Sequence, residues 1–181
     1  MKGFERKNRY FSLCGLNCAL CPMYVGGYCP SCGGGAGNQS CRIAKCSIEQ
    51  GSIEFCFECK KYPCEHYGEE DVVDSFITYR NRRADAERAK KDIRSYIREQ
   101  EEKEKILLWL LSECNDGRRK TLFCTAVNLL SLHQLEKVMN VLQEDKTELL
   151  KEKASLAATL LQEEAKKQGI SLSLRKNTER R

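Results

Sequence analysis

The chain has 181 residues, enough for one ordinary domain or for a small stabilised module attached to a second domain. Its first residues mix charges with single apolar side chains, and its longest apolar run, 106–111, is far shorter than the roughly 20 residues that cross a bilayer. We therefore expect no secretory signal and no membrane span, and predict a cytoplasmic protein. The formal net charge of +5 by itself suggests nucleic-acid binding.

Composition divides the chain at Gly68. Ten of the 12 cysteines, all three prolines and ten of the 12 glycines lie at or before this residue. The rest of the chain is rich in Leu, Glu, Lys, Ala, Arg and Gln, which favour helices. We predict a mainly α fold, in which an irregular Cys-rich metal-binding module over residues 1–68 packs on an α-helical domain over residues 69–181.

Apolar positions recur at helical spacing from Glu69 onward. The stripe continues at 93–97 and at 106–114, so it predicts two or three helices before a turn at 115–117. A further apolar helical segment is predicted over 122–130. The first apolar positions of the stripe are Val72, Val73, Phe76 and Ile77.

Two capping boxes are predicted in the last third of the chain. Ser131 and Asp145 are each followed three positions later by Gln or Glu, a pattern typical of helix starts. We expect the first of these helices to run to about Glu144 and the second to end near Gly169. The alternation of apolar residues with Ser over 170–174 predicts a short terminal strand or extended segment.

The cysteines are the strongest functional signal. Between Cys14 and Cys64 there is no sustained helical or strand period, only Cys residues spaced by Gly, Pro, Asn and Ser, including three Cys-x2-Cys pairs. In a reducing compartment this spacing indicates metal binding, with a disulfide scaffold as the alternative. The predicted metal ligands are Cys14, Cys18, Cys21, Cys29, Cys32, Cys41, Cys46, Cys56, Cys59, Cys64 and His66.

These ligands suffice for two tetrahedral zinc sites. One economical partition uses Cys18, Cys21, Cys29 and Cys32 for one ion and Cys46, Cys56, Cys59 and Cys64 for the other. The remaining candidates, Cys14, Cys41 and His66, are then alternates, and His66 is equally ordinary as a solvent-facing residue. Spacing alone does not decide the partition.

An iron–sulfur cluster is the alternative cofactor, because it also takes four thiolates. Cys21-Pro22 is similar to the end of a ferredoxin cluster run, but the full run is absent. The triad Cys14-x3-Cys18-x2-Cys21 has the spacing of radical S-adenosylmethionine enzymes. We reject that interpretation because no alternation of strands and helices follows the triad.

Zinc binding also changes the charge argument. If eight thiolates hold two Zn²⁺ ions, the net charge falls by about 4, to about +1. A general basic surface then disappears, so nucleic-acid binding is not expected. One local basic turn, Arg118-Arg119-Lys120, precedes a helix and suits a small-molecule anion, although a solvated turn is the favoured interpretation.

Three runs of sequence resemble a known family. They are Cys14–Pro22, Cys56–Glu65 and Asn115–Cys124, and they resemble a cysteine-rich prokaryotic family catalogued as domain of unknown function 3795. The likeness extends over most of the chain. It implies a host among anaerobic bacteria or archaea and adds weight to the Arg118 turn, a motif that the family repeats. No activity is established for the family, so the resemblance implies no catalytic residue.

The sequence therefore leads to one main functional hypothesis. A structural zinc module supports a binding or adaptor protein whose helices present a surface to a protein partner. The alternative is an iron–sulfur or thiol-based redox or sensor protein of anaerobic metabolism. A weaker hypothesis is an enzyme acting where the module meets the Arg118 turn, so enzymatic activity is left open.

Overall fold

The fold is mainly α. The computed structural model describes residues 3–35, 41–67 and 73–176, and these ranges contain helices but no strand. Three short 3-10 helices lie in the cysteine-rich part, namely η1 (Cys18–Leu20), η2 (Cys56–Glu58) and η3 (Glu65–Tyr67). The α-helices are α1 (Pro22–Val25), α2 (Arg42–Glu49), α3 (Arg82–Lys91), α4 (Ile93–Glu113), α5 (Lys120–Leu129), α6 (Leu132–Glu144) and α7 (Leu150–Lys167).

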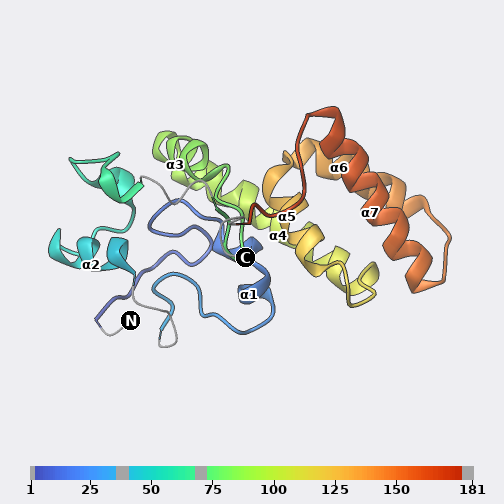
Figure 1. The fold of residues 1–181 in the computed structure, drawn as a ribbon, viewed down its shortest axis with the longest axis horizontal. Coiled ribbons are helices and arrows are strands. Elements are labelled where there is room, and N and C mark those ends of the chain that lie inside the picture. The colour runs from blue at the N-terminus through green and yellow to red at the C-terminus, as the bar shows by residue number, and fades with distance from the viewer. Residues whose placement is uncertain (1–2, 36–40, 68–72, 177–181) are drawn as a thin grey trace.

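The α-helices are spread along the long axis of the molecule (Figure 1). α2 lies at one end, α6 and α7 lie at the other, and α1, α3, α4 and α5 lie between them. After α7 the chain returns to the middle, where the backbone N–H of Asp74 donates to the carbonyl of Arg175 at 2.9 Å. No helix in the described ranges is both long enough and apolar enough to cross a membrane.

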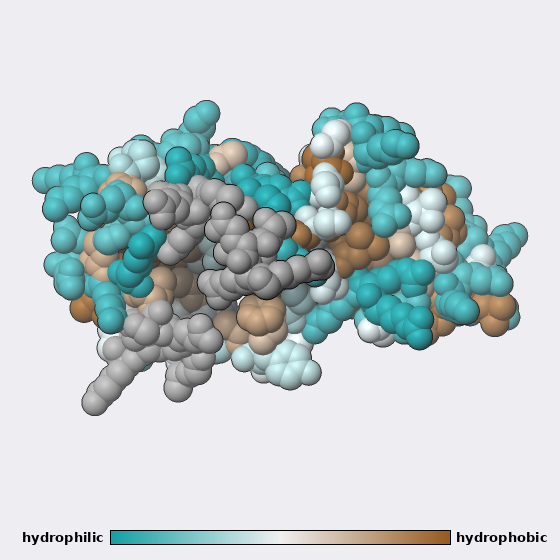
Figure 2. All heavy atoms as spheres, viewed as in Figure 1, coloured by the Kyte–Doolittle hydropathy of each residue, from teal (hydrophilic) through white to brown (hydrophobic). Residues whose placement is uncertain are grey.

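The largest hydrophobic core lies between α4, α5, α6 and α7. Leu107, Phe123, Leu135 and Leu161, one from each helix, are fully buried there. Leu20 of η1 belongs to the same cluster, so the cysteine-rich part contributes a side chain to the helical core. Burying each such side chain stabilises the fold by about 1.5–3 kcal/mol. Hydrophobic residues also gather over the C-terminal helices on the face shown in Figure 2, whereas most of that face is hydrophilic.

A second, aromatic core joins the cysteine-rich part to α3 and α4. Phe11 is buried between Phe55 and Tyr96, with ring centroids 6.0 Å and 4.9 Å away. Ala86 and Ala89 of α3 complete this cluster. The cysteine-rich part therefore packs on the helices, as the fold prediction expects. The boundary at residue 68 itself remains a prediction.

The predicted helix at the start of the apolar stripe is wrong over 73–81, where no helix forms. Val72 lies outside the described residues. Asp74 accepts hydrogen bonds from the backbone N–H of Tyr79 at 2.8 Å and of Arg175 at 2.8 Å. An aspartate that bonds to nearby backbone in this way competes with helix formation. Ile77 is buried whereas Phe76 is exposed, so these apolar residues do not form one buried helix face.

The two predicted capping boxes have different outcomes. Ser131 accepts from the N–H of Gln134, whose side chain accepts from the N–H of Ser131, so α6 begins and ends as expected. The box at Asp145 is wrong, because its carboxylate accepts from the N–H and hydroxyl of Thr147 and α7 begins only at Leu150. This local turn uses the side chain that would have capped the helix.

Candidate metal centre

α2 is the longest of the short helices that sequence analysis missed in the cysteine-rich part. Its eight residues bury Ile43, Ala44 and Ser47, which are spaced as one face of a helix. This short pattern was the available signal. The Ser47 hydroxyl donates to the carbonyl of Ile53 at 2.8 Å, so α2 is tied to the segment that leads to the next cysteines. Cys46 lies within α2 and faces that segment.

The segment opposite α2 carries three more candidate ligands. Cys56 is the first residue of the single turn η2 and Cys59 follows its last residue. The N–H of Cys59 donates to the carbonyl of Cys56 at 3.0 Å and closes the turn. Glu58 accepts from the N–H of Phe55 at 3.1 Å and stabilises the start of this turn. Cys64 follows on the same segment. The turn brings the two sulfurs of the Cys-x2-Cys pair to one side, as a metal knuckle requires.

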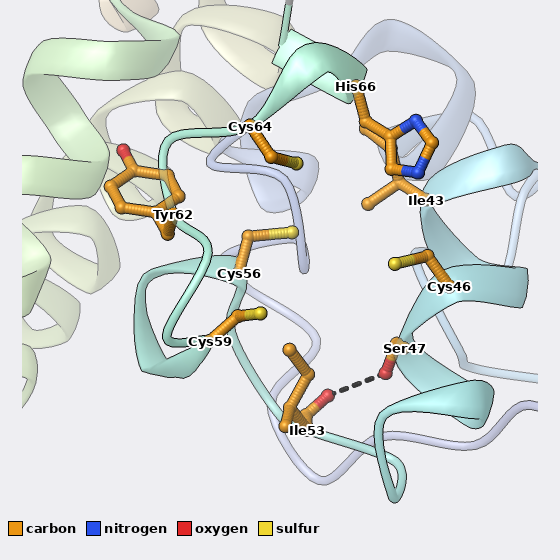
Figure 3. Close-up of a pocket in the computed structure, with 9 residues that line it drawn as sticks. All are labelled: Ile43, Cys46, Ser47, Ile53, Cys56, Cys59, Tyr62, Cys64 and His66. Atoms are coloured by element: carbon orange, nitrogen blue, oxygen red, sulfur yellow. Dashed lines mark hydrogen bonds between the residues drawn. The ribbon is translucent and has the colours of Figure 1, made fainter.

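Four sulfurs converge between these two segments (Figure 3). Cys46 points from α2 toward the opposite segment, and Cys56, Cys59 and Cys64 point back toward α2. They line a cavity of about 20 Å³, which is the space of about one water molecule. These four cysteines are the ones that the predicted partition assigns to the second of its two ions.

His66 lies beside the same cavity. It comes from η3, two residues after Cys64, and lies near Ile43 on the α2 side. Its side chain is partly buried rather than fully solvent-facing. His66 is therefore a neighbour of the four thiols and an available fifth donor.

A second and larger cavity of about 250 Å³ lies next to the first, and Ile43 lines both. Its lining differs from the predicted partition in two ways. Cys21, a predicted ligand, does not line it, whereas Cys14 and Cys41, predicted only as alternates, do. Apolar side chains such as Phe4 and Leu13 form the rest of its wall. The cysteines that line it are Cys14, Cys18, Cys29, Cys32 and Cys41.

Burial opposes thiolate formation around the larger cavity. It raises the pKa of Cys14 and Cys32 and raises that of Cys18 well above its ordinary value. At the smaller cavity, the pKa of Cys46 is raised by desolvation and then by the charges of Cys64 and Cys59. A bound metal cation reverses this effect, because it stabilises the thiolates that bind it.

Arg6 links the two cysteine segments and was not predicted. Its side chain is buried; Nε donates to the carbonyl of Glu54 at 2.9 Å and Nη1 to the carbonyl of Phe11 at 3.0 Å. Its charge also lowers the pKa of Cys32, against the larger effect of burial. No local pattern marks this residue, because its partners lie on separate parts of the chain.

All twelve cysteines lie in the described ranges, and no disulfide joins any two of them there. Among the residues placed in the structure, no group of three or more Cys, His, Asp or Glu side chains is arranged to hold a metal ion. Metal binding at the smaller cavity would therefore have to draw its four thiols closer, to Zn–S distances of about 2.3 Å. Cys114 and Cys124 are buried among the helices, away from both cavities.

The basic turn before α5 is partly neutralised within the chain. Asp116 accepts from the N–H of Arg118 at 3.2 Å and pairs with Arg119. Lys120 lies over the ring of Tyr28, 5.8 Å from its centroid. An anion at this turn would have to compete with Asp116. Of the three basic residues of the expected anion site, Arg118 is the one that is exposed.

Comparison of the chain with models of known families, with curated proteins and with solved structures finds no match.

Proposed function

We propose that the chain is a zinc-binding protein in which Cys46, Cys56, Cys59 and Cys64 hold one structural ion. The observation that carries this proposal is the convergence of these four sulfurs on one small cavity. An all-sulfur donor set favours zinc or iron–sulfur chemistry over Mg²⁺ or Ca²⁺, and a cavity of this size suits a single ion. Zinc would fix α2 against the segment that faces it.

The larger cavity is the proposed second metal site. Its five cysteines supply enough thiolates for a second zinc ion. Its volume of about 250 Å³ also favours the alternative function, in which an iron–sulfur cluster makes the protein a redox or sensor protein. Zinc remains the main proposal because the paired knuckles suit tetrahedral structural sites.

A binding or adaptor role in the cytoplasm is the function that we propose for the whole chain. Tyr28 and Phe76 are exposed aromatic side chains, 76% and 63% accessible, that line one hollow with Pro22 and Met23. Exposed aromatic residues and Met are enriched where proteins bind partners. Membership of domain of unknown function 3795 is part of the same proposal and is supported by the three sequence runs.

Metal analysis of anaerobically purified protein tests the proposal. We expect about two zinc ions per chain and no visible absorption. Cys46→Ala should lose about one ion, while Cys114→Ala, the same change at a buried cysteine outside both cavities, should lose none. Unchanged zinc content in the Cys46 variant would contradict the proposed site. A brown, oxygen-sensitive protein containing iron and sulfide would instead support the redox alternative.

A further inference from the structure

A polar cavity of about 440 Å³ lies between α3, α4 and the corner where α5 leads into α6. No cysteine lines it, so it is distinct from the proposed metal sites. Three of its polar residues are more than nine-tenths buried, and two of these are charged. Buried charges are unusual because each buried ion costs several kcal/mol. These three are Asp85, Lys103 and Asn128.

A hydrogen-bond network holds Asp85 and Asn128 in place. The side-chain amide of Asn17 donates to Asp85 at 3.0 Å and to Asn128 at 3.3 Å. The Tyr96 hydroxyl donates to the Asn17 carbonyl oxygen at 2.9 Å. Asn17 comes from the cysteine-rich part, whereas the other three residues come from α3, α4 and α5. The cavity wall is therefore assembled from distant segments and is rigidly positioned.

Lys103 and Asp85 carry opposite charges that do not satisfy each other. No ion pair within 4.0 Å joins them, although both line the cavity. The nearest anion to the Lys103 ammonium is Glu99, at 3.8 Å, and the nearest cation to Asp85 is Arg88, at 3.7 Å. Both distances exceed hydrogen-bond reach. The cavity is thus lined by two acidic and two basic side chains, and Arg88 also pairs with Glu99. Asp85 and Lys103 are ion-paired only at distances too long for a hydrogen bond, so each can still bind a further partner.

The start of α6 adds positive potential at the same cavity. Ser131, its N-cap, and Leu132, its first residue, both line the wall. The N-terminus of a helix favours an anion because its first N–H groups and its dipole point toward it. A carboxylate between Lys103 and this helix end would meet two favourable groups.

We propose that this cavity binds a small zwitterion of the α-amino-acid class, with its amine at Asp85 and its carboxylate between Lys103 and the start of α6. The volume lies within the range of about 300–1,000 Å³ that is typical of small-molecule sites. A simple amine would leave the Lys103 ammonium without an anion at hydrogen-bond distance. A simple acid would place its charge near Asp85 and Glu99 without a balancing amine.

Titration of the metal-loaded full chain with each proteinogenic amino acid tests the proposal. We expect at least one to bind, measured by calorimetry, and its matched amine and matched deaminated acid to bind at least tenfold more weakly. Absence of binding by every amino acid at about 10 mM, well above a weak Kd of about 1 mM, would overturn the proposal. Binding of the matched amine or the matched acid with the same affinity as the amino acid would also overturn it.

Two lysine variants on α4 locate the site. Lys103→Met should weaken binding of that amino acid at least tenfold, whereas Lys105→Met, two residues away and largely exposed, should leave it unchanged. Circular dichroism should show the same helix content in both variants. Full affinity in a folded Lys103→Met protein would place the ligand elsewhere and overturn the proposal. Asp85→Asn should weaken binding in the same way, with the affinity of the wild-type chain as reference.

Discussion

Two buried carboxylates show how environment decides the behaviour of the same side chain. Asp74 is shielded from solvent, yet hydrogen bonds from Arg175 and from backbone N–H groups outweigh burial and lower its pKa. Burial of Asp85 raises its pKa to about 6, because Lys103 and Arg88 lie too far away to compensate fully. The partners therefore outweigh burial at Asp74, whereas burial outweighs the partners at Asp85.

The stability of the two corresponding variants should depend on pH in opposite senses. The contribution of Asp74 is present above its unfolded pKa of about 3.9 and is lost as pH falls through its lower folded pKa. Asp74→Asn should therefore be less stable than the wild type at pH 7, and the difference should shrink in acid.

For Asp85 the folded state binds more protons between about pH 4 and pH 6, so stability falls as pH rises through this window. From pH 4 to pH 7 the free energy of unfolding of Asp85→Asn should therefore rise relative to that of the wild type, by at most roughly 3 kcal/mol. Urea unfolding of the three proteins from about pH 2 to about pH 7 measures both effects, because the Asp74 contribution is lost only below its unfolded pKa. Parallel pH profiles for the two variants would show that the assigned environments are wrong.

At the scale of single elements, local capping explains some helix boundaries and tertiary bonding explains others. α6 begins at Ser131 because its capping box uses only residues within its first turn. The segment around Asp74 is not helical because Arg175, far along the chain, binds its carboxylate. A capping pattern is thus informative where no other partner binds the capping side chain, whether that partner is near, as Thr147 is to Asp145, or far along the chain.

Removal of the α6 cap should have a modest, local cost. Ser131→Ala loses the acceptor for the N–H of Gln134 and should reduce the free energy of unfolding by about 1 kcal/mol. Ser155→Ala makes the same change at an exposed position within α7, where Ala favours the helix slightly, and serves as control. Equal stability of the two variants in thermal unfolding would argue against the cap.

At the scale of the whole molecule, the cysteine-rich part and the helices meet closely at Gly15. This residue has a φ of +92°, and a Cβ placed there would lie 2.6 Å from the carbonyl oxygen of Arg82 at the start of α3. Gly169 has a similar φ of +66°, but nothing lies within 4 Å of its Cβ position. Gly15 is therefore needed both for its backbone conformation and for the approach of the two parts.

The two glycines can be compared directly. Gly169→Ala should cost about 1 kcal/mol from its backbone conformation alone. Gly15→Ala should cost about 1–3 kcal/mol more, because the clash with the Arg82 backbone must be relieved by moving the two parts. Denaturant unfolding measures both. Equal losses of stability would show that the contact with α3 tolerates displacement.

The sequence by itself determined the mainly α class, the positions of α4 to α6 and the set of candidate thiol ligands. These depend on local spacing, such as the helical period of apolar residues, the box at Ser131 and the Cys-x2-Cys pairs. Only the tertiary structure decided which cysteines share a cavity, where Arg6 binds, and that Asp85 and Lys103 line one cavity. Such groupings depend on how α2 turns back on Cys56–Cys64 and how α3, α4 and α5 pack around Asn17. Partners far apart along the chain leave no periodic trace in it, so chain reversal and packing alone bring them together.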